Sequence, residues 1–185
     1  HIRHVREASP YHGEQTPYRP YFVGDRFEDH PPVAILVRDP ETSQQVWSGW
    51  QGYPGDFCYL EFHKKHMPGD HRYWRVTGAG VDMGAKAPYV PEWAESRVRD
   101  HAGNFLWTVK ETLRHAPHPG GKLPAVIAPF DAELFGHWWF EGPKWLVHAI
   151  RWMHADPDLK VMTGSAYVAE EEPTSAITLP EGSWA

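Results

Sequence analysis

Residues 92–128 read EWAESRVRDHAGNFLWTVKETLRHAPHPGGKLPAVIA, and this stretch decides the fold class. Its first part carries apolar residues three or four positions apart, the spacing of one helical face. After the helix, Pro117 and the pair Gly120-Gly121 predict its end. The apolar run Ala125–Ala128 then predicts a buried strand of the parallel type. The residues expected on the buried face of the helix are Ala94, Val98, Ala102, Phe105, Val109 and Leu113.

The alternation of predicted helices and strands extends to both sides of this stretch. Gly142-Pro143 predicts the start of another helix because Pro is suited to a first turn. Ser165 is expected to cap a short helix that ends before Pro173. Strands alternating with helices predict an α/β fold, either an α/β barrel or a doubly wound sheet. The other expected elements are buried strands at Val33–Val37 and Leu159–Met162, and a helical face made by Trp145, Leu146, Ala149, Ile150 and Met153.

Residues 1–32 and 40–92 show little periodicity and are expected to be loops, apart from a possible strand at Tyr73–Val76. A loop region as long as 40–92 is either functional or supported by elements elsewhere. Within it, Gln45–Asp56 combines Gly and Pro with the aromatic residues Trp47, Trp50 and Tyr53. Two interpretations stay open: aromatic platforms for a ligand, or a surface loop with its aromatics tucked beneath it.

Composition excludes several classes of protein. The chain has 185 residues, enough for one domain, with 18 basic and 24 acidic residues and a formal net charge of −6. A surface of that sign argues against a nucleic-acid or anionic-membrane partner. With no apolar run long enough to cross a membrane and a single cysteine, Cys58, we expect a cytoplasmic protein without an internal disulfide. Ten Trp residues fit sugar binding, since a sugar ring stacks on an indole, although most Trp residues pack cores.

Asp131 is the first charged residue after the predicted strand Ala125–Ala128. In α/β folds, sites gather at the carboxyl ends of parallel strands. The segment from Asp131 to Gly142 also carries Glu133, Glu141 and four aromatic residues. A carboxyl group walled by indoles and shielded from water would be available as a general acid near neutral pH. The alternative is that Asp131 only caps the turn while Glu133 and Glu141 are solvated.

Metal, thiol and phosphate chemistry find little support in the motifs. The closest histidine pairs, His63/His66 and His115/His118, lack the HExxH pattern and a neighbouring cysteine, so we expect no metal. Cys58 has no base beside it in the sequence. Gly78-Ala79-Gly80 is not a complete phosphate loop, and no cofactor is expected.

The segment Phe130–Pro143, FDAELFGHWWFEGP, resembles the signature of glycoside hydrolase family 57, and within it the group that contains the 1,4-α-glucan branching enzymes. Other segments occur in the same order as in that group, so the resemblance covers roughly the whole chain. These segments are Val37–Thr42, Gln45–Ser48, Gly52–Asp56, Tyr73–Gly78, His101–Phe105 and Leu179–Trp184.

The resemblance implies a fold and a reaction. The fold is a (β/α)7 barrel, here with long aromatic-rich loops. The reaction is retaining, with a glutamate attacking the sugar and an aspartate protonating the leaving oxygen, the two carboxyls about 5–5.5 Å apart. By resemblance, Asp131 is this general acid/base. The other substrate-binding residues implied are Trp47 and Trp184, lining donor or acceptor subsites, and Tyr53, His137 and Trp138, which also hold the acid in place.

The family's nucleophilic glutamate lies in a Trp-x-Pro-Glu motif upstream of the aspartate, and this chain has no matching segment. Tyr89–Glu92 imitates that motif but is expected to open the helix instead. We therefore expect residues 1–185 to be the C-terminal part of a family 57 catalytic barrel, truncated at both ends relative to the family and completed by the remainder of the same polypeptide. The expected partner is an α-1,4-glucan such as amylose, glycogen or a maltooligosaccharide.

The expected activity is the formation of α-1,6 branches in α-1,4-glucan. Two alternatives remain open. One is another family 57 specificity, that of an amylase or a 4-α-glucanotransferase. The other is a glucan-binding remnant without catalysis, because the nucleophile is not in this chain.

Overall fold

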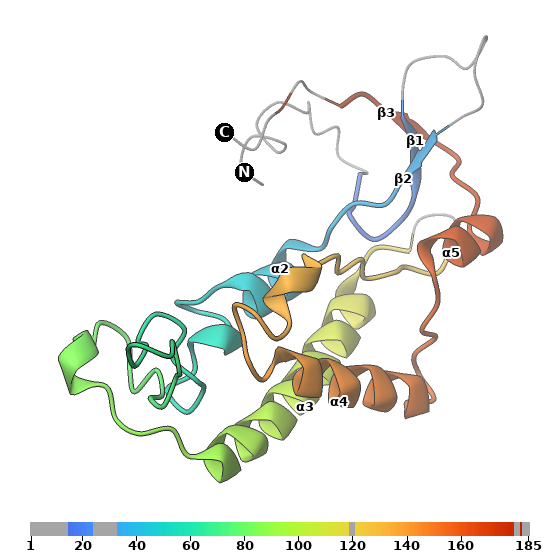
Figure 1. Ribbon diagram of the computed structural model, residues 1–185. Helices are drawn as coiled ribbons and strands as arrows, with labels where there is room; N and C mark the ends of the chain where they lie inside the picture. Colours follow the sequence, from blue (N-terminus) through green and yellow to red (C-terminus); the bar gives the residue numbers. More distant parts are fainter. Residues whose placement is uncertain (1–14, 24–32, 119–120, 180–181, 183–185) are drawn as a thin grey trace. The chain divides into compact units, whose positions relative to one another are not determined.

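The chain divides into two units in the computed structural model, which describes residues 15–23, 33–118, 121–179 and 182 (Figure 1). The first unit comprises His1–Pro40, Glu111–Ala128 and Met162–Ala185, and the second comprises Glu41–Lys110 and Pro129–Val161. Segments distant in sequence meet within each unit, so each has its own set of long-range contacts.

The first unit contains a small mixed sheet with the strand order β2-β1-β3. Strand β1 (Tyr21–Val23) pairs antiparallel with β2 (Val33–Ile35) and parallel with β3 (Ala176–Ile177). Tyr21 anchors β1, since its buried hydroxyl donates to the Thr16 carbonyl at 2.7 Å and accepts from the Arg19 Nε at 3.1 Å. The strand expected at Val33–Val37 is thus confirmed as β2, but its partner is antiparallel and Val33 is exposed.

Two other predicted strands are wrong. Residues 125–128 make one backbone hydrogen bond to each of two segments and form no ladder. Ala125 N donates to the Tyr18 carbonyl and Asp39 N donates to the Ile127 carbonyl, both at 2.9 Å. Residues 159–162 likewise form no strand. An apolar run becomes a strand only where another segment pairs with it in register, and the sequence of the run does not supply that partner.

Helix α5 (Gly164–Glu170) confirms the short helix of the first unit, but not its cap. Thr163 occupies the N-cap position, and its hydroxyl accepts a hydrogen bond from Ala166 N at 3.3 Å. Ser165 is the second residue of the helix, so the prediction that it caps α5 was wrong by two positions. The last helical residue, Glu170, precedes Pro173, as expected.

Two long helices organise the second unit, and Figure 1 shows them crossing beside each other. Helix α3 (Pro91–His115) buries the predicted face except for Leu113, which is half-buried. Helix α4 (Gly142–Ala155) begins at the predicted Gly-Pro pair and buries Trp145 and Ala149. Ile150, expected on the same face, is 46% exposed. The Phe105 ring of α3 meets the Trp145 ring of α4 edge-on at 5.0 Å, which joins the two helices.

Shorter elements connect these helices. Helix α2 (Pro40–Trp47) was not predicted, although Pro at its first position and Glu41 in its first turn are the usual signals of a helix start. The 3-10 turns given by the described residues after α2 are η1 (Tyr53–Gly55), η2 (Met83–Ala85) and η4 (Ala132–Leu134). The possible strand at Tyr73–Val76 is reduced to two isolated antiparallel bridges, Leu60–Arg75 and Trp74–Pro88.

The core of the second unit is mainly aromatic. Tyr59, Trp139 and Trp145 are at most 1% exposed, and the Trp139 ring lies 5.5 Å from Tyr59 and 5.4 Å from Trp145. This core fixes the loop that follows Pro129 against the loops that precede α3. The fold is thus a mixture of helices and strands, and no helix in the described ranges is long and apolar enough to cross a membrane.

Candidate functional site

Asp131 lies at the N-cap position of η4, where its backbone carbonyl accepts from Leu134 N at 3.1 Å. Its side chain is exposed and makes no capping hydrogen bond. Leu134 is buried and ties the turn to the core. The backbone of Asp131 is therefore held by the turn while its carboxylate is not engaged in capping it, which does not support the interpretation that Asp131 only caps the turn.

Trp138 is presented by the same loop. Its backbone N donates to the Glu133 carbonyl at 3.3 Å, and its indole Nε1 donates to the Glu133 Oε1 at 3.2 Å. The indole is 45% exposed and lies 4.6 Å from the ring of Phe62. His137, also exposed, packs edge-on against Phe62 at 5.3 Å and against Trp138 at 5.1 Å. These three rings form one aromatic group beside η4.

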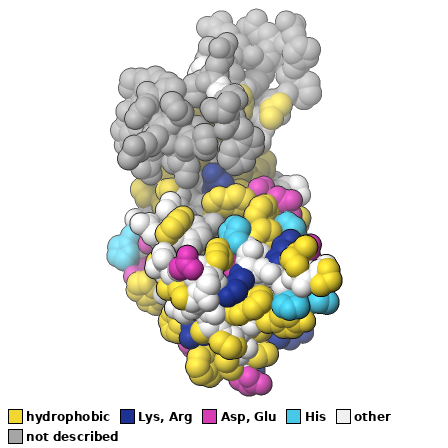
Figure 2. All heavy atoms as spheres, turned by 60° about the vertical axis from the view of Figure 1, so that its left-hand side comes forward, with side chains coloured by type: hydrophobic (Ala, Val, Ile, Leu, Met, Phe, Trp, Pro, Cys, Tyr) yellow, Lys and Arg dark blue, Asp and Glu magenta, His cyan; other side chains and the backbone are white. Residues whose placement is uncertain are grey.

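Trp47 and Trp138, both predicted to bind substrate, line one pocket of about 600 Å³. Trp47 comes from the end of α2 and Trp138 from the loop after η4, so two separate parts of the second unit supply the two indoles. The wall of the pocket contains both apolar and charged residues. On the face of the molecule drawn in Figure 2, hydrophobic side chains lie beside histidine and basic side chains. The remaining lining includes Trp50, Leu60, Glu61, Phe62, His63, Val76, Val81, Met83, Lys86 and Leu134.

Tyr53 is not among the residues that line this pocket. Tyr53 is 3% exposed, stacks on the His101 ring at 4.6 Å and donates its hydroxyl to the Asn104 Oδ1 at 2.7 Å. Burial raises the pKa of this hydroxyl well above its ordinary value. The two interpretations of the loop Gln45–Asp56 thus apply to different residues: the Tyr53 side chain is buried beneath the loop, whereas the Trp50 side chain is 79% exposed. Trp184 lies outside the described residues.

The shielded carboxyl expected in this region is Glu141, not Asp131. Glu141 is 2% exposed, and its Oε1 accepts from Leu60 N at 3.0 Å and from the Tyr89 hydroxyl at 2.7 Å. Burial raises the pKa of the Glu141 carboxyl despite these hydrogen bonds. The segments around Leu60 and Tyr89 cover Glu141 at the end of the loop, whereas Asp131 at its beginning is exposed, so the alternative that Glu141 is solvated was wrong.

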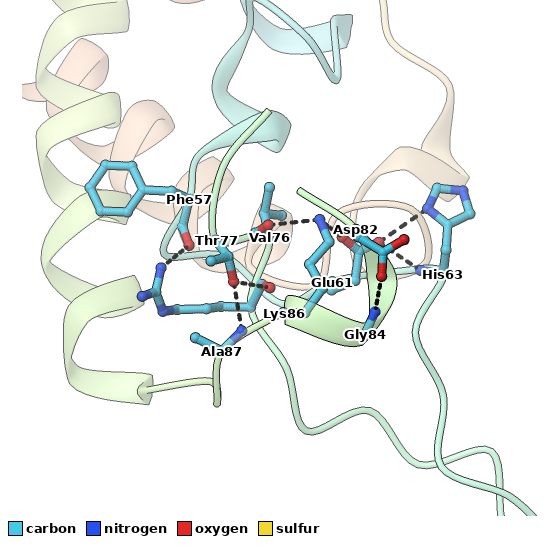
Figure 3. A network of polar contacts seen from close by, with 10 residues as sticks. Phe57, Glu61, His63, Val76, Thr77, Asp82, Gly84, Lys86 and Ala87 are labelled. Atoms are coloured by element: carbon cyan, nitrogen blue, oxygen red, sulfur yellow. Dashed lines mark hydrogen bonds and ion pairs between the residues drawn. The ribbon is translucent and has the colours of Figure 1, made fainter. Parts of the chain in front are cut away.

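A second buried carboxyl, Glu61, lies in the pocket wall and was not identified from the sequence. Its Oε2 forms an ion pair with the Lys86 Nζ at 2.8 Å, and its Oε1 accepts from the backbone N and the ring Nδ1 of His63 at 2.9 and 3.1 Å (Figure 3). Burial alone would raise the pKa of Glu61, but the bonds from Lys86 and His63 outweigh it and hold the pKa below its ordinary value.

No signal in the sequence joins these three residues. His63 was considered only as half of a possible metal pair, and Lys86 lies far along the chain in an aperiodic stretch. Lys86 is placed by η2, and its Nζ also donates to the Val76 carbonyl at 2.7 Å. The pair therefore depends on loop geometry, which a periodicity argument does not reach.

Comparisons with known proteins agree with the resemblance that the motifs indicated. A search against protein-family models finds no match. The chain is 41% identical over 172 residues to a 1,4-α-glucan branching enzyme of Thermococcus kodakarensis, covering 92% of this chain and 25% of that protein. It is 40% identical over 153 residues to a probable 1,4-α-glucan branching enzyme of Mycobacterium tuberculosis, covering 82% of this chain and 29% of that protein.

Solved structures share the fold as well. A family 57-type branching enzyme of Pyrococcus horikoshii superposes with a TM-score of 0.84 at 41% identity, covering 98% of this chain and 32% of that chain. An α-amylase of Thermotoga maritima superposes with a TM-score of 0.81 at 31% identity, covering 98% and 38%.

The chain thus spans about a quarter to a third of the length of the branching enzymes that it matches. The sequence match covers 92% of this chain and the structural match covers 98% of it. Both point to the same family as the motif Phe130–Pro143. The chain is therefore homologous to a part of the branching enzymes of glycoside hydrolase family 57.

Proposed function

We propose that this chain is part of a branching enzyme that forms α-1,6 linkages in α-1,4-glucan, and that Asp131 is its general acid/base. Residues 1–185 then form the C-terminal part of a (β/α)7 catalytic barrel, completed by the remainder of the polypeptide, in a cytoplasmic protein. The substrates are amylose, glycogen or maltooligosaccharides. The observation that carries the proposal is the pocket that Trp47 and Trp138 both line, together with Leu134 of the turn whose N-cap residue is Asp131.

The residues have distinct parts in this reaction. Trp47 and Trp138 offer indole faces on which glucosyl rings stack. A glutamate from the remainder of the polypeptide attacks the anomeric carbon, and the Asp131 carboxyl gives its proton to the departing glycosidic oxygen. The Asp131 carboxylate then takes the proton of the 6-hydroxyl of an acceptor glucan as that oxygen attacks the covalent intermediate, which forms the branch.

Glu92 is not the nucleophile in this proposal. It lies in the first turn of α3, as expected from the sequence, where a carboxylate is favourable next to the free backbone N–H groups of a helix start. Tyr53, His137 and Trp184 keep the predicted roles in substrate binding or support of the acid. For Tyr53 the hydrogen bond to Asn104 favours support over direct contact, because its ring is buried.

An α-amylase is the second candidate, since a protein of that activity shares the fold at 31% identity. A 4-α-glucanotransferase and a glucan-binding remnant follow. The products from amylose distinguish them: new α-1,6 linkages indicate branching, redistributed linear chains indicate disproportionation, and new reducing ends without branches indicate hydrolysis. Binding of maltooligosaccharide without turnover indicates the remnant.

The test is Asp131→Asn in the full-length protein. We expect branching activity on amylose to fall by about 10²–10⁴-fold, the usual contribution of a general acid/base. Activity is measured by the linkages released with a debranching enzyme. The unfolding midpoint should change little, because Asp131 is exposed and makes no capping bond.

Asp158→Asn is the matched control. Asp158 is also an exposed aspartate of the second unit, and it pairs with Lys110; neither residue lines the pocket. We expect this variant to branch amylose like the wild type. Branching by Asp131→Asn at the rate of Asp158→Asn would overturn the assignment of Asp131.

A further inference from the structure

The wall of the pocket contains a buried ion pair that stability alone does not explain. The side chains of Glu61 and Lys86 are only 7% and 6% exposed, and both line the pocket. Removing two charges from water costs several kcal/mol per ion, and their attraction often only compensates for that cost. A buried pair at this position is therefore better explained by what it holds in place.

What the pair holds is His63. The Glu61 carboxylate is ionised, since its pKa is below the ordinary value, and an ionised carboxylate only accepts hydrogen bonds. The ring Nδ1 of His63, 3.1 Å from Glu61 Oε1, must therefore carry the hydrogen. In a neutral imidazole, Nε2 is then the acceptor. Lys86, which also donates to the Val76 carbonyl, keeps the carboxylate in position.

His63 presents this acceptor beside an aromatic platform. Its side chain is 68% exposed and lines the pocket. Its ring packs edge-on against Phe62 at 5.1 Å, and the Phe62 ring in turn lies 4.6 Å from Trp138 and 5.3 Å from His137. A sugar ring that stacks on an aromatic face directs its hydroxyl groups outward around the rim of that face, where they need polar partners. The imidazole lies at such a rim.

We propose that His63 is a substrate-binding residue that accepts a hydrogen bond from a hydroxyl of a glucosyl unit stacked at Phe62 and Trp138. Glu61 and Lys86 are positioning residues that act through it. The ligand class, an α-1,4-linked glucan, rests on the proposed function. The sequence pattern and the resemblance assign no role to any of the three residues.

The experiment compares His63→Ala with His66→Ala in the full-length protein. His66 is an exposed histidine of the same loop that does not line the pocket. Dissociation constants for maltoheptaose are measured by calorimetry, and KM and kcat for amylose are measured alongside. Loss of one hydrogen bond of about 1 kcal/mol predicts a roughly fivefold weaker affinity and a higher KM for His63→Ala, with kcat little changed.

His63→Gln serves as the rescue variant, because its side-chain amide reaches about as far as Nε2 and offers an acceptor oxygen. We expect it to restore much of the affinity. Wild-type affinity in His63→Ala, or an equal loss in His66→Ala, would overturn the proposal.

The positioning role is tested by combining variants. If Glu61 acts through His63, Glu61→Gln weakens maltoheptaose binding in the wild type but adds nothing in the His63→Ala background. An equal loss in both backgrounds would indicate a merely structural effect and overturn this part. Should Glu61→Gln fail to fold, the pair Glu61→Gln/Lys86→Met, in which no charge is left unpaired, replaces it.

Binding separates this inference from the proposed function. Wild-type protein that binds maltoheptaose without forming branches would contradict the branching activity and leave the role of His63 to be decided by the affinities of its variants. Wild-type protein that binds no maltoheptaose would overturn the ligand class and this inference with it.

Discussion

Glu61 and Glu141 are both buried glutamates of the second unit, 5% and 2% exposed, and the pKa values of their carboxyls move in opposite directions. Burial disfavours the charged form of each. Glu61 has a cation at 2.8 Å, the Lys86 ammonium, together with two donors from His63. Glu141 has no cation bonded to it among the described residues; Leu60 N and the Tyr89 hydroxyl, both neutral donors, bind its Oε1.

The comparison shows that the partners of a buried carboxyl count beside its burial: at Glu61 the bonds from Lys86 and His63 outweigh burial, whereas at Glu141 burial outweighs the neutral donors. Glu61 is held as an anion in the pocket wall, where it orients an imidazole. Burial raises the pKa of Glu141 in the aromatic core, where its Oε1 accepts from Leu60 N and from the Tyr89 hydroxyl. The Oε2 of Glu141 has no hydrogen-bond partner in the described structure, so this oxygen gains no bond that would offset its burial.

Removing the Lys86 ammonium should have the largest effect on the free energy of unfolding. Lys86→Met leaves the Glu61 carboxylate without its counter-charge, which for a buried pair costs about 3–5 kcal/mol of unfolding free energy. The measurement is denaturant unfolding of the full-length protein, followed by Trp fluorescence. Lys65→Met is the control, because Lys65 pairs with Asp70 at the surface and its loss should cost no more than about 0.5 kcal/mol.

Adding Glu61→Gln to Lys86→Met should recover most of the stability lost, since no buried charge then remains. If Lys86→Met is as stable as Lys65→Met, the ion pair does not hold Glu61 as an anion, and the contrast with Glu141 disappears.

Glu141 should respond to the loss of an acceptor and not to the loss of a charge. Glu141→Leu leaves Leu60 N and the Tyr89 hydroxyl without their acceptor and should cost about 2 kcal/mol. Glu141→Gln keeps an acceptor oxygen and should cost less than about 1 kcal/mol. Denaturant unfolding of the two variants checks this, and equal losses would show that the negative charge of Glu141 matters after all.

The sequence predicts the helices of this chain better than its strands. Periodic apolar residues and the Gly142-Pro143 pair locate α3 and α4, because a helix forms its hydrogen bonds within one segment. The runs 125–128 and 159–162 are as apolar as strands, yet a ladder needs a partner that the run itself does not specify. Helix α2 was missed although Pro40 and Glu41 signal its start.

The candidate site divides in a similar way. Asp131 was chosen from its place after the predicted strand and from the resemblance to family 57, and Trp47 and Trp138 from that resemblance; the structure brings Trp47 and Trp138 to one pocket. Glu61 and Lys86 could not be paired from the sequence, because their contact depends on the path of two aperiodic loops. The same limit explains why the sequence does not tell which carboxyl of the segment 131–142 is shielded, since distant loops cover Glu141.

The two glutamates should also give opposite dependences of stability on pH. The pKa of Glu141 is raised in the folded state, so above the ordinary carboxyl value of about 4.3 the unfolded chain ionises first. Its contribution to stability is therefore present at low pH and is lost as pH rises toward the folded pKa, by about 1.4 kcal/mol for each tenfold difference between the folded and unfolded ionisation constants. Thermal unfolding of wild type and Glu141→Gln from acid to neutral pH should show the variant gaining relative stability.

Glu61 reverses the sign. Its folded pKa is lowered, so its contribution is present above the ordinary carboxyl value and is lost as pH falls through the folded pKa. The variant Glu61→Gln/Lys86→Met lacks this contribution, so acid should destabilise the wild type more than the variant. If the curves of both variants run parallel to that of the wild type, neither carboxyl has a shifted pKa. If both diverge with the same sign, burial governs both carboxyls, and the cation at Glu61 does not decide its charge.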